Sequence, residues 1–470
     1  MSAETTLQSL WQFAGCAPDF LQQLRFSGNG QQLSSTFQVG DIACASIAAQ
    51  ALMAAQIWQQ RSGHVQQVEV DRRHALALFR SERYLTIDGQ APADLWSKIA
   101  GYYQAGDGRW IQLHTNFPHH RDGVLRVLHC ADQREAVAQA IQGWSAHELD
   151  ARLAAEGMCA AMIRTAPEWQ AHPQAAAIAS LPLFEIERIG DAPPQPLAPL
   201  QTGRPLSGVR VLDLSRVIAA PVAARTLAQH GAEVLAISAA HLPNILPLVI
   251  DTGRGKRSAQ LDLRREQGRE SLRELVRGAD VFLQAYRPGA LAGQGFSPEA
   301  LQQLRPGMIH VSLSAYSHLG PWAGRRGFDS LVQSATGIAY EEGVAAGLSG
   351  PGKLPCQALD HATGYLAAFA TMVALHRRAV EGGSWQVRVS LAQTGHWLQG
   401  LARRGGQEDA AELSAAEIAA SLETTECSFG LVSAVKPVEQ MSATPAYFAW
   451  PPVPPGTHAA QWSPDLVGYI

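Results

Sequence analysis

The chain has 470 residues, 46% of them hydrophobic and 17% charged, which is long enough for two or three domains and too apolar for a disordered protein. Its 37 Lys and Arg residues nearly balance 41 Asp and Glu residues, giving a net charge of −4 with no long run of one sign. This balance excludes broad electrostatic binding of nucleic acid or of an anionic membrane, so any anionic ligand must be held by a local cluster of charge.

The N-terminal segment indicates the cellular location of the protein, and the cysteine pattern indicates whether disulfides or a zinc site are expected. No basic segment followed by an apolar run opens the sequence, and no uncharged apolar stretch of about 18 residues occurs in it, so we expect a cytoplasmic protein without a membrane partner. The six cysteines stand singly with no C-x-x-C pair. A disulfide framework or a zinc site is therefore not expected.

The first predicted elements are a helix and a strand within residues 41–70. Asp41 begins a helix of about five turns that is rich in small residues, and a Gly-containing turn leads from it to a strand. Residues 96–183 follow with a mixed pattern of a strand at 107–114 and helices near 134–156. This order indicates a mixed domain in the front part of the chain.

A connector separates this front part from an α/β half. Residues 190–205 are dense in Pro and Gly and lack periodic apolar spacing, as is typical of a solvated linker. Beyond it, short apolar strands alternate with helical segments: strands at 209–214, 232–237, 281–284 and 309–313, and a helix at 219–230. This alternation predicts an α/β fold with a parallel, doubly wound sheet.

Residues 360–389 repeat residues 41–70 without a gap. Eleven of the thirty positions match, and the six matches that are not alanine fall at a helix start, a helix end and a strand. The α/β half precedes Asp360, whereas only about forty residues precede Asp41, too few for such a sheet. We interpret this pattern as an internal duplication with one incomplete copy.

Asp360 is the main catalytic candidate. A carboxylate at a helix N-terminus lies beside unpaired N–H groups and the positive end of the helix dipole, so we expect a lowered pKa and an exposed, ionised side chain. A plain helix N-cap is the alternative, because Asp is a preferred cap. The turn-forming segment LSGPGKLPCQALD before the helix and the Ala-Thr-Gly within it favour a nucleophile beneath a loop.

A dense basic cluster lies within residues 254–265, which hold Arg254, Lys256, Arg257, Arg264 and Arg265. It predicts either a phosphorylated ligand or an ordinary solvated loop. The segment Tyr286-Arg287-Pro288-Gly289 directly follows the strand at 281–284, at the edge where open α/β sheets bind ligands. No G-x-G-x-x-G or P-loop is present, so a classical dinucleotide site is not expected.

Two other polar clusters have simpler explanations. Asp329, beside Arg325 and Arg326, is expected to cap a turn near surface arginines. His119 and His120 are adjacent, but neighbouring side chains point in different directions and no third ligand has metal-like spacing. We therefore predict no metal site.

Residues 205–395 resemble the large domain of the family III CoA-transferases, which include formyl-CoA transferase, carnitine CoA-transferase and α-methylacyl-CoA racemase. The matching stretches, in family order, are PLSGVRVLDLSRVIAAP (205–221), HGAEVLAI (230–237), GKRSAQLDLR (255–264), ADVFLQAYRPGAL (279–291), MIHVSLSAYSHLGPW (308–322), GFDSLVQSATG (327–337) and ALDHATGYLAAFATMVALHRR (358–378). The resemblance implies a Rossmann-like large domain, a smaller α+β domain and a homodimer of interlocked subunits.

The resemblance also implies a reaction. Asp360 would attack an acyl-CoA thioester, giving an aspartyl mixed anhydride and then an aspartyl-CoA thioester, from which CoA passes to an acceptor carboxylic acid. Coenzyme A and its acyl esters would be substrates, with no permanently bound cofactor. The CoA contacts implied by the resemblance are Arg216, Val217, Ala219, Lys256, Arg257, Leu261, Arg264, Tyr286 and Arg287.

Three departures from the family pattern keep other functions open. Ser238-Ala239-Ala240 stands where most members carry Glu and a basic or Pro-containing stretch, so one phosphate contact is missing. Phe328 stands where racemases carry a second acid/base histidine, and the Gly-rich loop of formyl-CoA transferase has no equivalent. The alternatives are an acyl-CoA isomerase, racemase or lyase on the same fold, and a non-catalytic CoA-binding paralogue.

The order of segments also departs from that of the family. Residues 101–118 and 167–174 look like small-domain segments but precede the large domain, and residues 443–462 resemble the C-terminal return. The predicted division is a truncated repeat with Asp41 (1–92), a small mixed α/β domain (93–189), a Pro/Gly-rich linker (190–205), a Rossmann-like CoA-binding large domain with Asp360 (206–400) and a C-terminal return segment (401–470). Asp360 is then the working carboxylate and Asp41 a remnant or structural cap.

Overall fold

The computed structural model describes residues 2–92, 96–200, 203–404 and 410–463. Its largest sheet has seven strands in the order β10-β9-β8-β11-β12-β13-β7, all parallel except β7, which runs antiparallel to β13. These strands are β7 (Phe184–Gly190), β8 (Arg210–Leu214), β9 (Glu233–Ser238), β10 (Lys256–Gln260), β11 (Val281–Gln284), β12 (Ile309–Ser314) and β13 (Ser384–Ser390). The expected α/β fold with a large parallel sheet is confirmed.

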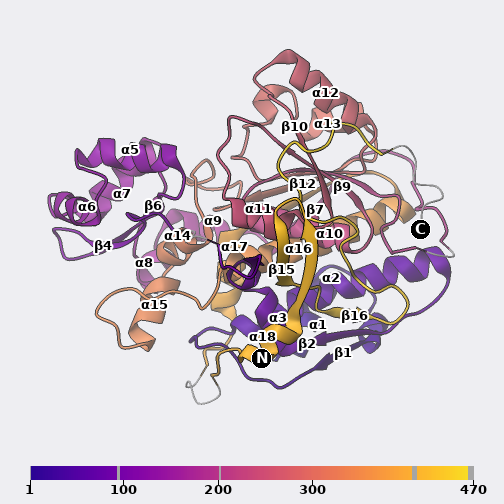
Figure 1. Ribbon diagram of the computed structural model, residues 1–470, viewed down its shortest axis with the longest axis horizontal. Coiled ribbons are helices and arrows are strands. Elements are labelled where there is room, and N and C mark those ends of the chain that lie inside the picture. Colours follow the sequence, from indigo (N-terminus) through magenta and orange to yellow (C-terminus); the bar gives the residue numbers. More distant parts are fainter. Residues whose placement is uncertain (1, 93–95, 201–202, 405–409, 464–470) are drawn as a thin grey trace.

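Helices cover both faces of this sheet, because successive side chains of a strand point to opposite sides. In β8, Val211 belongs to the core shared with α10 (Ala219–Gln229) and α16 (Ala358–Glu381), whereas Leu212 belongs to the core under α12 (Glu266–Arg277). Figure 1 shows α12 and α13 (Pro298–Leu304) above the strands, and α10, α16 and α2 (Val39–Ser62) below them.

The two repeated segments form a matched pair of helices. Helices α2 and α16 each have 24 residues, start two residues before Asp41 or Asp360, and are followed by a glycine with positive φ, Gly63 or Gly382. They pack side by side in the core. Helix α2 is long and apolar enough to cross a membrane, but 94% of its most apolar window is buried inside the protein. Helix α2 is therefore a helix of the protein core.

The strands that follow these two helices lie in different sheets. Strand β13 belongs to the large sheet, whereas β2 (Val68–Asp71) pairs with β1 (Leu24–Ser27) on one side and with β16 (Glu439–Met441) on the other. A second C-terminal pair, β14 (Leu422–Cys427) and β15 (Gly430–Val435), adds to β3 (Thr86–Ile87). Residues near the C-terminus thus bind the N-terminal segment into the fold.

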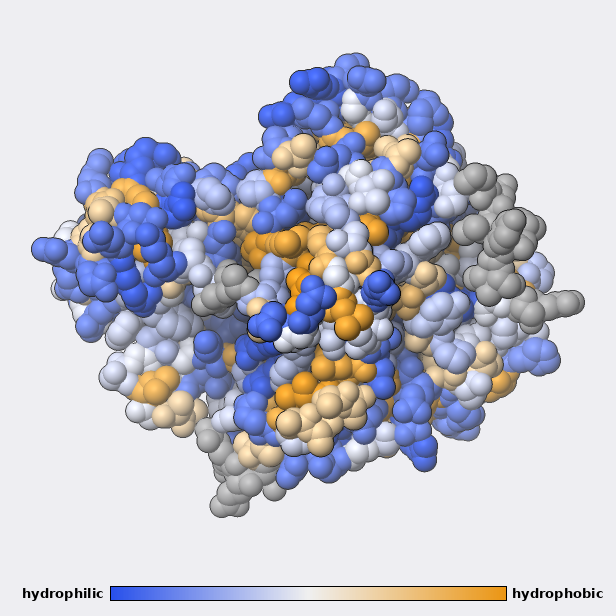
Figure 2. All heavy atoms as spheres, in the orientation of Figure 1, coloured by the Kyte–Doolittle hydropathy of each residue, from blue (hydrophilic) through white to orange (hydrophobic). Residues whose placement is uncertain are grey.

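A small domain stands apart from these layers. Its antiparallel sheet consists of β4 (Gly101–Gln104), β5 (Trp110–Leu113) and β6 (Ala160–Met162), with a core of its own under α5 (Pro118–Leu128), α6 (Arg134–Ile141) and α7 (Ala146–Ala155). Figure 1 shows it as the lobe at the left, and Figure 2 shows hydrophilic residues over this lobe and the α12 lobe, with hydrophobic surface between them.

The remaining helices connect these parts. They are α1 (Ala3–Phe13), α3 (Arg72–Leu78), α4 (Ser81–Tyr84), α8 (Ala166–Gln170), α9 (Pro173–Ala179), α11 (Leu246–Gly253), α14 (Asp329–Ala335), α15 (Ile338–Ala345), α17 (Leu391–Gly400) and α18 (Ala415–Ser421), with 3-10 turns at Pro18–Gln23 and Ala292–Gln294. Residues 191–200 of the predicted linker form neither helix nor strand. Two of these helices, α4 and α14, are short, and both reach the start of α16.

Gly364 sets how closely α16 approaches α10, and its replacement tests that packing. A Cβ atom at this position would lie 2.5 Å from the carbonyl oxygen of Ala219, a backbone atom that cannot move away easily. We expect Gly364→Ala to lower the free energy of unfolding by about 1–3 kcal/mol in urea denaturation. In Gly395→Ala, a helical control whose nearest contact would be 3.6 Å, stability should stay or rise by up to about 1 kcal/mol. Equal stability of the two variants would contradict this account.

Candidate active site

Asp360 stands in the first turn of α16, where two cavities meet. The first cavity has a volume of about 560 Å³ and the second of about 370 Å³. Four residues line both of them: Val217, Ile218, Phe328 and Asp360. A ligand in either cavity therefore reaches the same carboxyl group.

A carboxylate from another helix, Asp329, caps the start of α16. Its Oδ2 accepts the backbone N–H of Asp360 at 2.9 Å, and its Oδ1 accepts the side-chain amide of Gln333. Within the described part of the chain the Asp360 side chain makes no hydrogen bond, so the capping role predicted as an alternative for Asp360 belongs to Asp329. The expectation that Asp329 is a surface turn cap is wrong, since the residue is 1% exposed.

Burial and like charge act on the Asp360 carboxyl group. Asp360 is 8% exposed, and its burial, followed by the charges of Asp329 and Glu82, raises its pKa well above the ordinary value. Burial also raises the pKa of Asp329 to about 6. The predicted lowered pKa and exposed position of Asp360 are therefore wrong, because desolvation and two neighbouring carboxylates outweigh the helix dipole.

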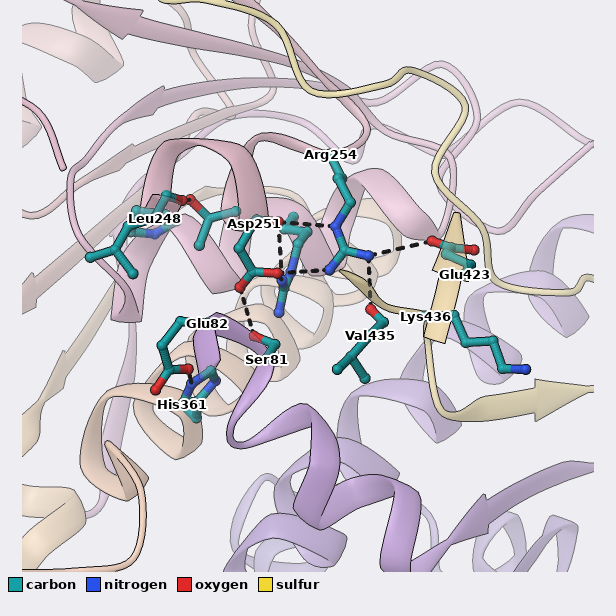
Figure 3. A network of polar contacts seen from close by, with 12 residues as sticks. Ser81, Glu82, Leu248, Asp251, Arg254, His361, Glu423, Val435 and Lys436 are labelled. Carbon is teal, nitrogen blue, oxygen red and sulfur yellow. Dashed lines mark hydrogen bonds and ion pairs between the residues drawn. The ribbon is translucent and has the colours of Figure 1, made fainter. Parts of the chain in front are cut away.

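The second carboxylate, Glu82, reaches the site from the N-terminal part of the chain (Figure 3). Glu82 lies on α4, lines the first cavity, and bonds through Oε2 to Nε2 of His361 at 3.1 Å. His361 is fully buried beside Asp360, and its ring stacks on Phe79 with centroids 5.4 Å apart. Residues far from the large domain in sequence thus form one wall of the site.

A buried ion cluster fixes α4 against the large domain. Ser81 donates to Oδ2 of Asp251 at 2.6 Å, while Oδ1 of Asp251 is 2.9 Å from both Arg225 and Arg254. Arg254 also donates to the carbonyl oxygen of Val435 in β15 at 2.8 Å. Figure 3 shows Ser81 and Glu82 extending from α4 in different directions, one toward Asp251 and the other toward His361. The cluster therefore holds the helix that carries Glu82.

The second cavity is rich in guanidinium groups. Arg216, Arg287 and Arg326 line it, and none of them has a carboxylate within ion-pair distance in the described residues. Arg326 donates to Nε2 of His120 at 2.9 Å, and burial together with the charges of His119 and Arg326 lowers the pKa of His120 to about 3. Arg216 donates to the carbonyl of Pro243, and burial lowers its pKa. Such a cavity is suited to an anionic ligand.

The loops after β8 and β11 bring several predicted CoA contacts into the second cavity. Arg216, Val217, Ala219, Tyr286 and Arg287 all line it. Val217 has a positive φ of 75°, an unusual conformation for a β-branched residue and one that recurs at functional sites. Leu261 and Arg264 line a separate pocket of about 150 Å³, which shares Tyr286 with the second cavity.

The basic cluster at 254–265 divides between structural and surface roles. Arg254 belongs to the buried Asp251 cluster, and Lys256, 3% exposed, donates to Oδ2 of Asp213 at 2.7 Å. Arg257 pairs with Glu233 at 3.1 Å and donates to the carbonyl of Gln461, while Arg264 pairs with Asp262 at the surface. Lys256 and Arg257 line a pocket of about 90 Å³ that also includes Arg216.

Sequence reasoning did not assign a functional role to three residues that the structure brings to the cavities. Asp329 and Arg326 belong to the quoted segment Arg325-Arg326-Gly327-Phe328-Asp329, but no sequence pattern indicated that they are turned inward. Glu82 follows an apolar helix with no motif of its own. Asp41 is 9% exposed and is not among the residues lining the two cavities around Asp360. Among the described residues, no group of three His, Cys, Asp or Glu side chains is arranged to hold a metal ion.

Comparison with known proteins gives consistent results. CoA-transferase family III matches residues 23–194 and 206–404. "Acetyl-coenzyme A transferase nodX" of Hypoxylon pulicicidum is 31% identical over 322 residues, which cover 64% of this chain and 54% of the relative. "Probable fatty acyl-CoA transferase Rv3272" of Mycobacterium tuberculosis is 34% identical over 213 residues, 42% of this chain and 52% of the relative.

Further relatives match smaller parts. "Succinyl-CoA:glutarate CoA-transferase" of Mus musculus is 30% identical over 196 residues, 39% of this chain and 44% of the relative. The crystal structure of the Mycobacterium tuberculosis protein Rv3272 shares 33% identity and a TM-score of 0.38, covering 42% of this chain and 56% of that one. The chain spans about half the length of the curated relatives it matches.

Removal of Asp251 tests the cluster that anchors α4. Asp251→Ala would leave the guanidinium groups of Arg225 and Arg254 buried without their carboxylate, so we expect a loss of about 3–5 kcal/mol of unfolding free energy. Glu423→Gln is the control, because Glu423 contacts the same Arg254 at 3.4 Å from a partly exposed position and should cost at most about 1 kcal/mol. Chemical denaturation measures both. Losses of similar size would show that the buried carboxylate has no special role.

Proposed function

The chain belongs to CoA-transferase family III, and on this premise we propose that it transfers CoA from an acyl-CoA to a carboxylic acid through a covalent intermediate on Asp360. The observation that carries the proposal is the position of Asp360 between two cavities. One cavity can hold the acid and the other the CoA arm, so that both reach one carboxyl group. The donor acid and the acceptor acid would then both react at the Asp360 carboxyl group, whichever of them binds first.

The second cavity is the proposed site of the CoA arm. Arg216, Arg287 and Arg326 suit the diphosphate, because none has a carboxylate partner among the described residues and guanidinium groups bind phosphate oxygens in pairs of hydrogen bonds. Tyr286 links this cavity to the pocket of Leu261 and Arg264, which we assign to the adenosine end. The thioester then lies at Asp360. Lys256 and Arg257, held in internal ion pairs, support the neighbouring loop rather than add free charge.

Each step of the proposed reaction is an acyl transfer that balances in atoms and electrons. The Asp360 carboxylate attacks the thioester carbonyl, the C–S bond breaks, and CoA thiolate leaves an aspartyl mixed anhydride. The thiolate attacks the aspartyl carbonyl and releases the donor acid as its carboxylate. The acceptor carboxylate attacks the resulting aspartyl-CoA thioester, and the thiolate returns to the acceptor carbonyl, regenerating the Asp360 carboxylate. No oxidant, reductant or net proton is consumed.

The crowding of carboxylates around Asp360 favours this chemistry. Asp329 and Glu82 make the ionised form of Asp360 costly, as its raised pKa indicates. Acylation turns Asp360 into a neutral ester-like group and removes one of the crowded charges, so the repulsion is relieved as the bond forms. The first N–H groups of α10, at Ala219 and Ala220 beside the second cavity, can stabilise the oxyanions formed on the way.

A second function is favoured by one contact. His114 of the small domain stacks on Phe328 with ring centroids 3.8 Å apart and lines the first cavity with Asp360. This contact places an imidazole next to Phe328, the position at which the racemases that the sequence resembles carry a histidine. Burial lowers the pKa of His114 to about 4, so it is neutral and a proton acceptor at pH 7. Deuterium exchange at the α-carbon of an acyl-CoA, lost in His114→Gln, would support proton transfer over CoA transfer.

Trapping of the acyl-enzyme tests the transferase proposal directly. Hydroxylamine cleaves an aspartyl anhydride or thioester to a hydroxamate, so incubation with acyl-CoA should inactivate the enzyme and modify the peptide that holds Asp360, as read by mass spectrometry. Asp360→Asn should abolish the modification and lower turnover by about a thousandfold or more. Asp41→Asn, the matched control at the start of α2, should keep both. If the Asp360→Asn variant kept the modification and the turnover while the Asp41→Asn variant lost them, the reaction would belong to Asp41 of helix α2.

The pH profile of trapping tests the role of like charge. Only ionised Asp360 is a nucleophile, so the trapping rate should rise with pH through its raised pKa. Asp329→Asn removes the neighbouring charge that has the larger effect on Asp360, which lowers the pKa of Asp360 and should move this rise to lower pH. Glu82→Gln should move it in the same direction by less. A rise that stays in place, or moves to higher pH, would show that these carboxylates do not control Asp360.

A further inference from the structure

We infer that the start of helix α5, in the small domain, positions the guanidinium groups of Arg216 and Arg326 in the second cavity for binding the CoA diphosphate. The positioning residues are Phe117 and His120. The inference rests on the proposed function and adds that the small domain takes part in the phosphate-binding wall. Figure 1 shows α5 in the small-domain lobe at the left, whereas both arginines belong to the large domain.

Phe117 and His120 lie on the same side of the start of α5. Phe117 directly precedes the helix, Pro118 is its first residue, and His120 follows Phe117 by three positions, a spacing that places side chains on one side of a helix. Both residues are buried, and their rings meet edge to face with centroids 5.8 Å apart. Each ring centroid is also 6.1 Å from that of Phe328, which lines both cavities. The start of α5 therefore packs against the wall of the site.

A hydrogen bond to His120 holds Arg326. Nη1 of Arg326 lies 2.9 Å from Nε2 of His120, and because a guanidinium group can only donate, Nε2 accepts. Burial, followed by the charges of His119 and Arg326, lowers the pKa of His120 to about 3, so the ring is neutral near pH 7 and Nε2 keeps its lone pair. The thiol of Cys159 lies farther from the same nitrogen, at 3.6 Å. The other nitrogens of Arg326 remain available to a ligand in the second cavity.

The second ring nitrogen of His120 indicates that the fold keeps this histidine at a cost in stability. His120 is 4% exposed, and Nδ1, which carries the proton when Nε2 accepts, has no hydrogen-bond partner among the described residues. A buried donor without an acceptor destabilises the folded state. A phenylalanine ring would occupy similar space beside Phe117 and Phe328 without this cost. The hydrogen bond to Arg326 therefore gives a functional reason for a histidine at this position.

An aromatic ring and a backbone carbonyl hold Arg216. The central carbon of its guanidinium group lies 4.9 Å from the centroid of the Phe117 ring, and one of its nitrogens donates to the carbonyl of Pro243. Its Nε is buried and has no acceptor within the described ranges, so it can donate to a phosphate oxygen. Arg287, by contrast, is exposed. Arg216 and Arg326 are thus ordered before a ligand arrives, which reduces the entropy lost on binding.

Calorimetric binding of CoA to the full chain tests this inference without relying on turnover. His120→Phe keeps a ring of similar size but removes the acceptor, so we expect CoA to bind about three- to tenfold more weakly, because a long side chain must then be ordered on binding. The melting temperature should stay the same or rise, because the unpaired N–H group is removed. His120→Gln, whose side-chain oxygen can accept from Arg326, should recover most of the affinity. His147→Phe, the same exchange at an exposed position of α7, should leave the affinity unchanged.

Double variants separate positioning from other effects. Arg326→Gln alone should weaken CoA binding by about tenfold to a hundredfold, as loss of a charged donor predicts. His120→Phe should then add no further loss, because no guanidinium group is left to position. Phe117→Leu should weaken binding by about two- to fivefold in the wild type and not at all in Arg216→Gln. In turnover, KM for the acyl-CoA should rise with the dissociation constant while kcat is retained, because the groups that react at Asp360 are unchanged.

Unchanged CoA affinity in His120→Phe would overturn the inference. So would an equal loss in the Arg326→Gln background, which would show that His120 acts without Arg326. A loss of affinity that accompanies a lower melting temperature, and that His120→Gln does not recover, would make the residue structural only. If hydroxylamine trapping fails while these differences in affinity hold, the transferase chemistry is wrong but the positioning stands. If the wild type does not bind CoA, both proposals are wrong.

Discussion

The capping of α16 by Asp329 is the interaction on which the site depends. A helix that begins in the protein interior needs acceptors for its first N–H groups, and here one acceptor is a carboxylate from α14. That choice places a second buried carboxyl group beside Asp360. The structural requirement of the helix start therefore also contributes to the raised pKa of the Asp360 carboxyl group. An amide or hydroxyl cap would satisfy the helix without adding a like charge to the effect of burial on the pKa of Asp360.

The site is also completed by parts of the chain that are distant in sequence. Helix α4 contributes Glu82 and is held by Ser81 on Asp251, whose arginine partners reach α10 and β15. The C-terminal strands in turn pair with β2 and β3 of the N-terminal segment. Loss of either terminal region would therefore loosen the wall of the first cavity, although neither carries Asp360. The large domain alone is not the complete site.

The sequence predicted the strands and helices of the fold better than the burial and pairing of its charged residues. Continuous apolar runs such as VRVLDL have one outcome, a strand buried on both faces, and the matched segments at Asp41 and Asp360 each formed the expected helix, turn and strand. Burial of a charged residue depends instead on what folds against it from elsewhere. Asp329 and Arg326 looked like neighbours on a surface turn, yet one is buried and the other lines a cavity. Likewise Arg254 and Lys256, consecutive members of a basic cluster, pair with interior carboxylates that sequence spacing does not reveal.

The arrangement of two cavities around Asp360 favours the proposed reaction through a covalent intermediate. Among the described residues, Val217, Ile218, Phe328 and Asp360 are the ones that line both cavities, and the other lining residues of the two cavities carry different charge. Under the proposed assignment, an acid in the first cavity and a thiol in the second meet at Asp360. If Asp360 carries the acyl group or the CoA in turn, one acid can leave and another enter while the CoA arm stays bound to its arginines.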